Sequence, residues 1–159
     1  MLKVEVRGTE ALIAKLNAIP SRVREELYRT VTALTLKLEQ HVKADKLSGQ
    51  VLHVRTGALR RSIASKVDQS GSSVIGRVFS SGDVKYAGIH EFGGKTPPHE
   101  IVAKGRALAF EMGGQMRFFK RVQHPGSVMP ERSFLRSSLS DMRVEIVSEI
   151  QEAVRRGTQ

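Results

Sequence analysis

One long amphipathic pattern constrains the fold of this chain more than any other feature. Six apolar residues are separated by four, four, three, four and four positions, which places them on one face of an α-helix. They are Val23, Leu27, Val31, Leu34, Leu38 and Val42. The pattern predicts a helix from about Ser21 to about Ala44, roughly 36 Å long at 1.5 Å per residue. A face of that length needs a partner surface to cover it.

Shorter patterns divide the rest of the chain into strands and three further helices. Alternating apolar and charged residues predict strands, and glycines mark the ends of several segments. We expect strands over 2–7, 62–69, 73–80, 106–112 and 115–122, and helices over 10–19, 85–92 and 131–155. Residues 99–104 are a candidate further strand, Pro130 should occupy the first turn of the last helix, and residues from Gly157 onward should fray.

The hairpin expected around Gly113 and Gly114 has a definite register. A two-residue turn there pairs facing residues across the two strands. The pairs are Phe110 with Arg117, Leu108 with Phe119, and Arg106 with Arg121. The last pair sets two positive charges opposite each other, which is unfavourable. Either the strands splay at that point, or an anionic group lies between them.

These elements predict an α+β fold in a single domain over residues 1–159. We expect a mixed or antiparallel sheet of four to six strands, packed by the long N-terminal helix and the C-terminal helix. Residues 46–56 and 93–104 are rich in glycine, proline and polar residues, and we expect flexible loops there. Such loops are candidate assembly arms.

The charge of the chain is concentrated in its middle. The formal net charge is +10, and residues 43–124 carry 14 basic and 6 acidic side chains. A basic surface attracts nucleic acid, a membrane or an acidic protein, or simply keeps a protein soluble. The low aromatic content, 5%, argues against reading single strands by base stacking. No apolar run approaches the roughly 20 residues of a membrane span, and no secretory signal is visible, so we expect a soluble protein without a membrane partner.

The motifs for catalysis and cofactor binding that we considered are incomplete or absent in this sequence. The chain has no cysteine, which excludes thiolate metal sites and cysteine nucleophiles. His90-Glu91 begins like the helix of a zinc protease, but Gly94 stands where the second histidine is needed. The phosphate-binding P-loop and the Gly-x-Ser-x-Gly elbow are also missing. We therefore expect no enzyme, metal or cofactor, and a small hydrolase is the enzyme alternative.

Two groups of residues have both a structural and a functional interpretation. One group is Tyr86, Ile89 and Phe92, which would share a helix face. That face is either part of the hydrophobic core, which is the simpler interpretation, or a binding site. His90 is either packed beside Tyr86 and bonded to a carbonyl, or a pH-sensitive partner contact. A second group follows at the expected turn after Thr56. Its members are Arg55, Arg60 and Arg61, which are either solvated or placed to hold a phosphate or carboxylate.

Three fragments, taken in order, resemble a family of tailed-phage proteins known as tail-component, neck or minor tail proteins. The fragments are Arg55-Thr56-Gly57-Ala58-Leu59-Arg60, then Tyr86-Ala87-Gly88-Ile89-His90-Glu91-Phe92-Gly93, then Pro130-Glu131-Arg132-Ser133-Phe134-Leu135. The long N-terminal helix and the C-terminal helix also fit this family. The resemblance covers nearly the whole chain, and the stretch 94–130 is where we expect divergence.

The resemblance implies a structural part of a virion, assembled in the host cytoplasm near the head–tail junction or tail terminus. Proteins of this family form rings, commonly of six or twelve copies, next to head-closure and tail-terminator or tail-tube proteins, with DNA passing through the channel. The candidate assembly contacts are Arg55, Arg60, Arg61, Tyr86, His90, Glu91, Phe92, Pro130 and Phe134. The alternative is a basic nucleic-acid-binding module.

Overall fold

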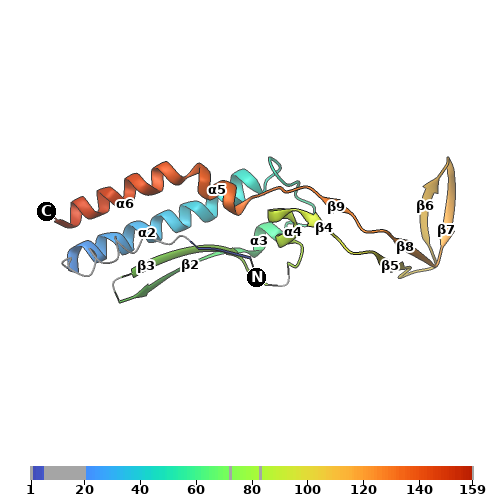
Figure 1. Ribbon diagram of the computed structural model, residues 1–159, viewed down its shortest axis with the longest axis horizontal. Helices are drawn as coiled ribbons and strands as arrows, with labels where there is room; N and C mark the ends of the chain where they lie inside the picture. Colours follow the sequence, from blue (N-terminus) through green and yellow to red (C-terminus); the bar gives the residue numbers. More distant parts are fainter. Residues whose placement is uncertain (1, 6–20, 72, 83, 159) are drawn as a thin grey trace.

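The protein consists of a layered body and a long two-stranded arm that leaves the body at one end (Figure 1). The structure is a computed structural model and describes residues 2–5, 21–71, 73–82 and 84–158. The strand expected over 2–7 is present as β1 (Leu2–Glu5). The helix expected over 10–19 lies outside the described residues.

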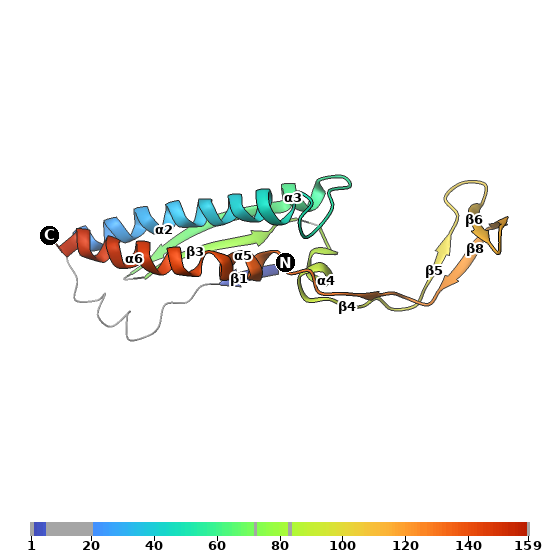
Figure 2. The same ribbon diagram turned by 90° about the horizontal axis from the view of Figure 1, so that it is seen from above.

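The long helix predicted from the apolar stripe forms the middle layer of the body. Helix α2 spans Ser21–His41, and one π-helical turn, η1 (Val42–Lys46), continues it. Five of the six stripe residues are buried, and Val31 is half-buried. The sheet packs on one side of α2 and the C-terminal helix on the other, so both sides of this helix are used (Figures 1 and 2).

The sheet of the body is smaller than the sequence indicates. Strands β2 (Ile63–Ser70) and β3 (Ser73–Ser80) form an antiparallel hairpin, and β1 adds on the far side of β3, in the order β1-β3-β2. The prediction of four to six strands is wrong for the described residues, where the other strands form separate two-stranded ribbons. Those strands pair with one another because they lie on the two legs of one long excursion of the chain.

A glycine sets how closely the sheet lies on α2. A Cβ atom at Gly76 would lie 2.0 Å from the Thr35 hydroxyl oxygen, which is far too close. The Thr35 hydroxyl in turn donates to the carbonyl of Val31 within α2. The sheet can therefore lie close to α2 at this point, because glycine leaves room for the Thr35 side chain.

The C-terminal segment forms two helices where the sequence predicts one. They are α5 (Leu135–Asp141) and α6 (Arg143–Thr158), with a break at Met142. Pro130 precedes the first helix by several residues, so its expected place in the first turn is wrong. Helix α6 packs on α2 and not on the sheet.

The expected fraying at Gly157 is also wrong. Helix α6 continues through Thr158, and Gly157 is buried against the first turn of α2. A Cβ atom at Gly157 would lie 2.5 Å from the Cα of Val23. Because glycine has no side chain, the last turn of α6 can touch the backbone of α2.

The arm, defined as residues 94–129, is a nested antiparallel ribbon in three sections. The sections are β4 (Gly94–Lys95) with β9 (Val128–Met129), β5 (His99–Val102) with β8 (Arg121–His124), and β6 (Leu108–Met112) with β7 (Gln115–Phe119). The segment 93–104, expected as a flexible loop, is thus largely strand. At about 3.3 Å per residue, residues 94–112 reach at most about 60 Å.

The register of the terminal hairpin confirms two of the three predicted pairs. Phe110 faces Arg117 and Leu108 faces Phe119. The third pair is wrong, because Arg121 faces Val102 and residues 103–107 loop out opposite Lys120. The bulge separates the two arginines, and Arg121 instead lies 3.6 Å from Glu100. The ribbon bends there, so the terminal hairpin turns away from the stem (Figure 1).

The hydrophobic core lies in the body alone. One cluster joins the C-terminal half of α2 to the sheet and α5, and a smaller one joins the first turns of α2 to α6. The larger cluster comprises Leu38, Val42, Leu47, Leu52, Leu59, Ile63, Val78, Ala87, Phe134, Leu135 and Met142. Among the described residues, no helix is long and apolar enough to cross a membrane.

Candidate functional site

The second and third sequence fragments meet at the base of the arm. Helix α4 (Ala87–Phe92) leads into the outgoing strand β4, and the returning strand β9 leads into α5. Between them lies Glu91, whose side chain is fully buried. Its carboxylate accepts the backbone N–H groups of Phe134 at 2.8 Å, Leu135 at 2.9 Å and Arg136 at 2.9 Å. We call this arrangement the clasp: Glu91, Arg136 and the backbone of residues 133–136.

The clasp provides hydrogen-bond acceptors and a negative charge at the start of α5. The first N–H groups of an α-helix have no partner within the helix, and a negative charge there is favourable. Glu91 provides both from outside the helix, and the Ser133 hydroxyl adds a fourth donor at 2.8 Å. Helix α5 therefore begins at Leu135, where these bonds converge, and not at the proline upstream.

Arg136 closes the clasp from the solvent side. Its Nε donates to the carboxylate of Glu91 at 3.2 Å, and its Nη2 donates to the Glu91 carbonyl oxygen at 2.8 Å. The same Nη2 lies 2.8 Å from the carboxylate of Glu131, and the guanidinium sits 4.7 Å from the ring centre of Phe92. One side chain thus joins α4, the returning strand and α5.

Only glycine fits at position 93, where the outgoing and returning chains meet at the base of the arm. Its φ angle is +67°, a conformation that side-chain-bearing residues rarely adopt. A Cβ atom there would lie 2.8 Å from the Glu131 nitrogen and 3.0 Å from the Met129 oxygen. One step earlier, the Arg132 N–H donates to the His90 carbonyl at 2.8 Å. The outgoing and returning chains are therefore in backbone contact.

The clasp holds its acid in the ionised form. Burial raises the pKa of Glu91, but the N–H groups of Leu135, Arg136 and Phe134 and the Ser133 hydroxyl together outweigh it. The net pKa of Glu91 therefore lies below its ordinary value. A buried carboxylate that is charged near neutral pH and fully hydrogen-bonded serves as a structural fastener, because it has no proton to exchange at that pH.

His90 has the packing expected of it but not the hydrogen bond. Its ring meets that of Tyr86 edge to face, with centroids 5.8 Å apart. Its Nδ1 is buried without a hydrogen-bond partner in the part of the chain that the structure describes. Burial lowers the pKa of His90, and the nearby positive charge of Arg132 lowers it further, so the ring is neutral at pH 7.

The apolar stripe predicted on α4 is wrong as a core face. Tyr86 is 44% exposed and Phe92 is 55% exposed, whereas the buried residues of this helix are Ala87 and Glu91. The helix therefore turns its acid inward and its aromatic residues outward. Of the remaining candidates, Phe134 is fully buried in the core and Pro130 is exposed.

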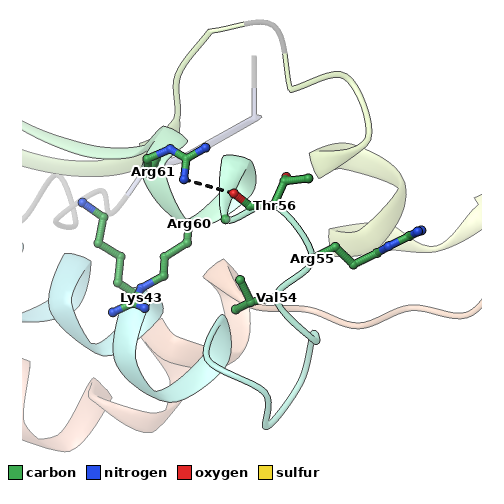
Figure 3. A pocket seen from close by; sticks show the side chains of 7 residues that line it. Lys43, Val54, Arg55, Thr56, Arg60 and Arg61 are labelled. Atoms are coloured by element: carbon green, nitrogen blue, oxygen red, sulfur yellow. Dashed lines mark hydrogen bonds between the residues drawn. The ribbon is translucent and has the colours of Figure 1, made fainter.

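The three candidate arginines gather in a separate place. Arg55, Arg60 and Arg61 line a pocket of about 500 Å³, together with Lys43, Val54, Thr56 and Gly57 (Figure 3). We call it the basic pocket. Arg61 donates to the Thr56 carbonyl at 3.0 Å, and Lys43 is paired with Glu39. Arg55 points away from Lys43 and Arg60, so the four charges do not converge on one point.

The sequence predicts a candidate assembly arm over residues 93–104, but not the exposed apolar surface of the whole ribbon. Large apolar side chains lie exposed along it: Ile101, Val102, Met112, Met116, Phe118, Phe119 and Val128. The signal was present in the sequence, since Phe118 and Phe119 are adjacent and cannot both face one core in a regular strand. The expectation that these strands belong to the central sheet is wrong.

No family model, curated protein or solved structure matched this chain in the three comparisons made. Within the described ranges, no cluster of three or more histidine, aspartate or glutamate side chains is placed to hold a metal ion. The features that the geometry offers are a layered body, a fastened arm base and an exposed apolar ribbon.

Proposed function

We propose that this protein is a structural subunit of a tailed-phage virion, acting at the neck or tail-completion region that joins head to tail. It works by assembling with copies of itself into a ring, of six or twelve subunits, and by contacting head-closure and tail-terminator or tail-tube proteins. It carries out no catalysis, binds no cofactor, and reaches the virion from the host cytoplasm.

The observation that carries the proposal is the exposed apolar arm on a fastened base. Monomeric proteins rarely expose large contiguous apolar patches, and those that do use them for interaction. The arm adds nothing to the core. The clasp, which joins the second fragment of the phage-protein resemblance to the end of the third and to Arg136, holds the arm to the body by at least six hydrogen bonds to Glu91. A rigid body with a reaching arm suits a ring subunit.

The test uses a phage that carries this gene. We expect its deletion to yield filled heads and separate tails by electron microscopy, with loss of plaque formation. Wild-type protein supplied from a plasmid should restore joined particles, whereas a variant with residues 97–126 replaced by a short glycine-serine turn should not. Glu131→Gln, which changes an exposed acid near the arm base, should restore them and serves as the control. Infectious tailed particles from the deletion phage contradict the proposal.

A second candidate function, nucleic-acid binding, is favoured by the basic pocket and the charge of the arm. Residues 94–129 carry six basic and two acidic side chains. Binding through phosphate contacts should weaken steeply with salt, because each contact releases counterions. Fluorescence anisotropy with duplex DNA across a salt series tests it, with Arg55→Ala and Arg60→Ala as the variants. No binding at low salt excludes this function, and weak binding that neither variant alters does not support it.

A further inference from the structure

We propose that the terminal hairpin of the arm, β6 with β7, inserts into an apolar cleft with an acidic rim on a different protein. The inference rests on the proposed function, and it names the chemistry of the partner that the arm reaches. The hairpin stands clear of its own body in both views (Figures 1 and 2), so the helices and the sheet of the same chain do not cover it.

The hairpin has apolar side chains on both of its faces. The register places four of them on the first face and two on the second: Leu108, Phe110, Met112 and Phe119, then Met116 and Phe118. Phe110 and Phe119 stack with ring centroids 5.3 Å apart, yet Met112 on the first face is 52% exposed and Phe118 on the second is 68% exposed. A flat docking surface covers only one face of a ribbon. A partner that covers both faces must therefore surround the hairpin, as the walls of a cleft do.

The backbone of the hairpin favours a protein cleft over a lipid bilayer. Among the described strands, β6 and β7 pair only with each other, so the outer edge of each has no strand beside it. Open strand edges do not occur in the hydrocarbon of a bilayer, because their N–H and C=O groups have no partner there. A protein can bond such edges, for example by adding a strand of its own. A protein cleft can therefore cover both the apolar side chains and the backbone edges.

Basic residues lie on either side of the turn section of the hairpin. Residues 103–106 and 117–121 carry five basic side chains and no acidic one, whereas residues 107–116 carry a single charge, Glu111. We call the five basic residues the collar: Lys104, Arg106, Arg117, Lys120 and Arg121. All five are exposed, and within the described residues only Arg121 has an ion pair, with Glu100. A protein that receives the hairpin would complement the collar with acidic side chains at the rim of its cleft.

The charges also argue against nucleic acid and against a second copy of this chain. Phosphates would meet the collar but would be repelled by Glu111, and they would leave the methionines beside the turn uncovered. Outside the arm, this chain carries 20 basic and 14 acidic side chains, so another copy is itself basic. Exposed acids of the body already have cationic partners, as Glu131 has Arg136 and Asp141 has Lys46. The chemistry of the hairpin therefore fits a different, acidic protein.

Photo-cross-linking in cells that produce the phage tests this contact with the full-length chain. The photoreactive amino acid p-benzoylphenylalanine replaces either Met112 on the first face or Phe118 on the second. Both positions are exposed and lie outside the core clusters, so the body should fold normally. We expect both variants to cross-link to the same protein, which is not this chain. The linked segments, identified by mass spectrometry, should contain more acidic than basic residues.

The control position is Val144, which is 82% exposed on α6 and lies away from the arm. The same photoreactive residue there should not link to those segments. A cross-link from Met112 or Phe118 alone indicates a flat contact and overturns the cleft. Cross-links mainly to copies of this chain, to nucleic acid or to lipid overturn the proposal. Linked segments without an excess of acidic residues, or no cross-link from either position, overturn it as well.

Charge reversal in the collar provides a second measurement. Arg117→Glu and Lys120→Glu should each lower the yield of the cross-link from position 118 several-fold, because each would bring a negative charge to an acidic rim. Lys95→Glu makes the same change in β4, at the root of the arm, and should leave the yield unchanged. An unchanged yield in the two collar variants, or an equal loss in all three variants, overturns the acidic rim.

The proposed function is judged separately, by the deletion phage. If the deletion phage gives infectious tailed particles while cross-links from both faces reach one acidic protein, the virion role is rejected and the cleft contact is kept. If the deletion separates heads from tails while the cross-links fail, the virion role is kept and the cleft contact is rejected.

Discussion

Glu91 and Phe134 are both fully buried, and the carboxylate of the first accepts the backbone N–H of the second at 2.8 Å across 43 residues of sequence. The excursion between them is the arm. The bond therefore closes the loop from which the arm projects and ties that loop to the start of α5. Since Phe134 is also part of the main core cluster, the arm base is anchored to the most buried part of the body.

Replacing the buried acid should weaken the fold more than replacing its exposed neighbour. In Glu91→Gln, the charge is lost and an amide NH₂ faces backbone donors, so we expect a loss of about 2–4 kcal/mol in the free energy of unfolding. Glu131→Gln removes an exposed acid that contacts the same Arg136 and should cost about 1 kcal/mol or less. Urea unfolding of both variants beside the wild type measures the difference, and equal losses would reject the clasp as a fastener.

The stability of the protein should fall on acidification. The pKa of Glu91 is lower in the folded protein than in the unfolded chain, so the unfolded chain binds more protons in acid. The contribution of Glu91 to stability is complete above the ordinary glutamate pKa. It is lost as the pH falls through the pKa of Glu91 in the folded protein. His90 acts in the same direction at higher pH, because burial first and Arg132 second lower its pKa below 6.5.

The measurement is the urea-unfolding midpoint from about pH 7 down to about pH 4. We expect a decline that begins near the ordinary histidine pKa and steepens below the ordinary glutamate pKa. Other carboxylates contribute equally in wild type and Glu91→Gln, so the difference between the two proteins isolates Glu91. That difference should shrink as the pH falls, and a constant difference would be inconsistent with the lowered pKa.

Adding one methyl group at the end of α6 should be costly. Gly157→Ala places a Cβ atom 2.5 Å from the Cα of Val23, and neither backbone can move without separating α6 from α2. We expect a loss of about 1–3 kcal/mol, typical of overpacking. Gly105→Ala in the arm is the matched control, since no atom lies within 4 Å of its new Cβ. Thermal unfolding should separate the two variants by several degrees.

Removing most of the arm should leave the body folded. A variant with residues 97–126 replaced by a short glycine-serine turn keeps β4, β9 and the clasp, and it loses no member of the core clusters. We expect its free energy of unfolding to match the wild type within about 1 kcal/mol and its circular dichroism to keep the helical signal. Cooperative unfolding at a much lower urea concentration would show that the arm supports the body.

Local patterns predict the long helix and two of the three facing pairs in the terminal hairpin. The stripe from Val23 to Val42 and the turn at Gly113 and Gly114 are short-range signals, and each is confirmed. The predicted pairing of Arg106 with Arg121 is wrong. The bulge of five residues that separates them is not a local signal, because it depends on how the next section of the ribbon pairs.

What the sequence could not reveal was which strands leave the body. The adjacent Phe118 and Phe119 do not fit a strand with one core face, but no local pattern shows that β5 to β8 pair only with one another. Glu91 illustrates the same limit in the clasp, because its partners lie more than 40 residues away. A buried acid and an exposed Phe92 on one short helix invert the usual pattern, and only the tertiary contact with α5 accounts for it.

The way the two roots of the arm meet has a consequence for how such proteins diversify. Gly93 and Glu131 lie in backbone contact, so the chain enters and leaves the excursion at nearly the same point. Paired residues can be gained or lost between those roots without moving any atom of the helices. The length of the arm can therefore change while the interior of the body stays the same.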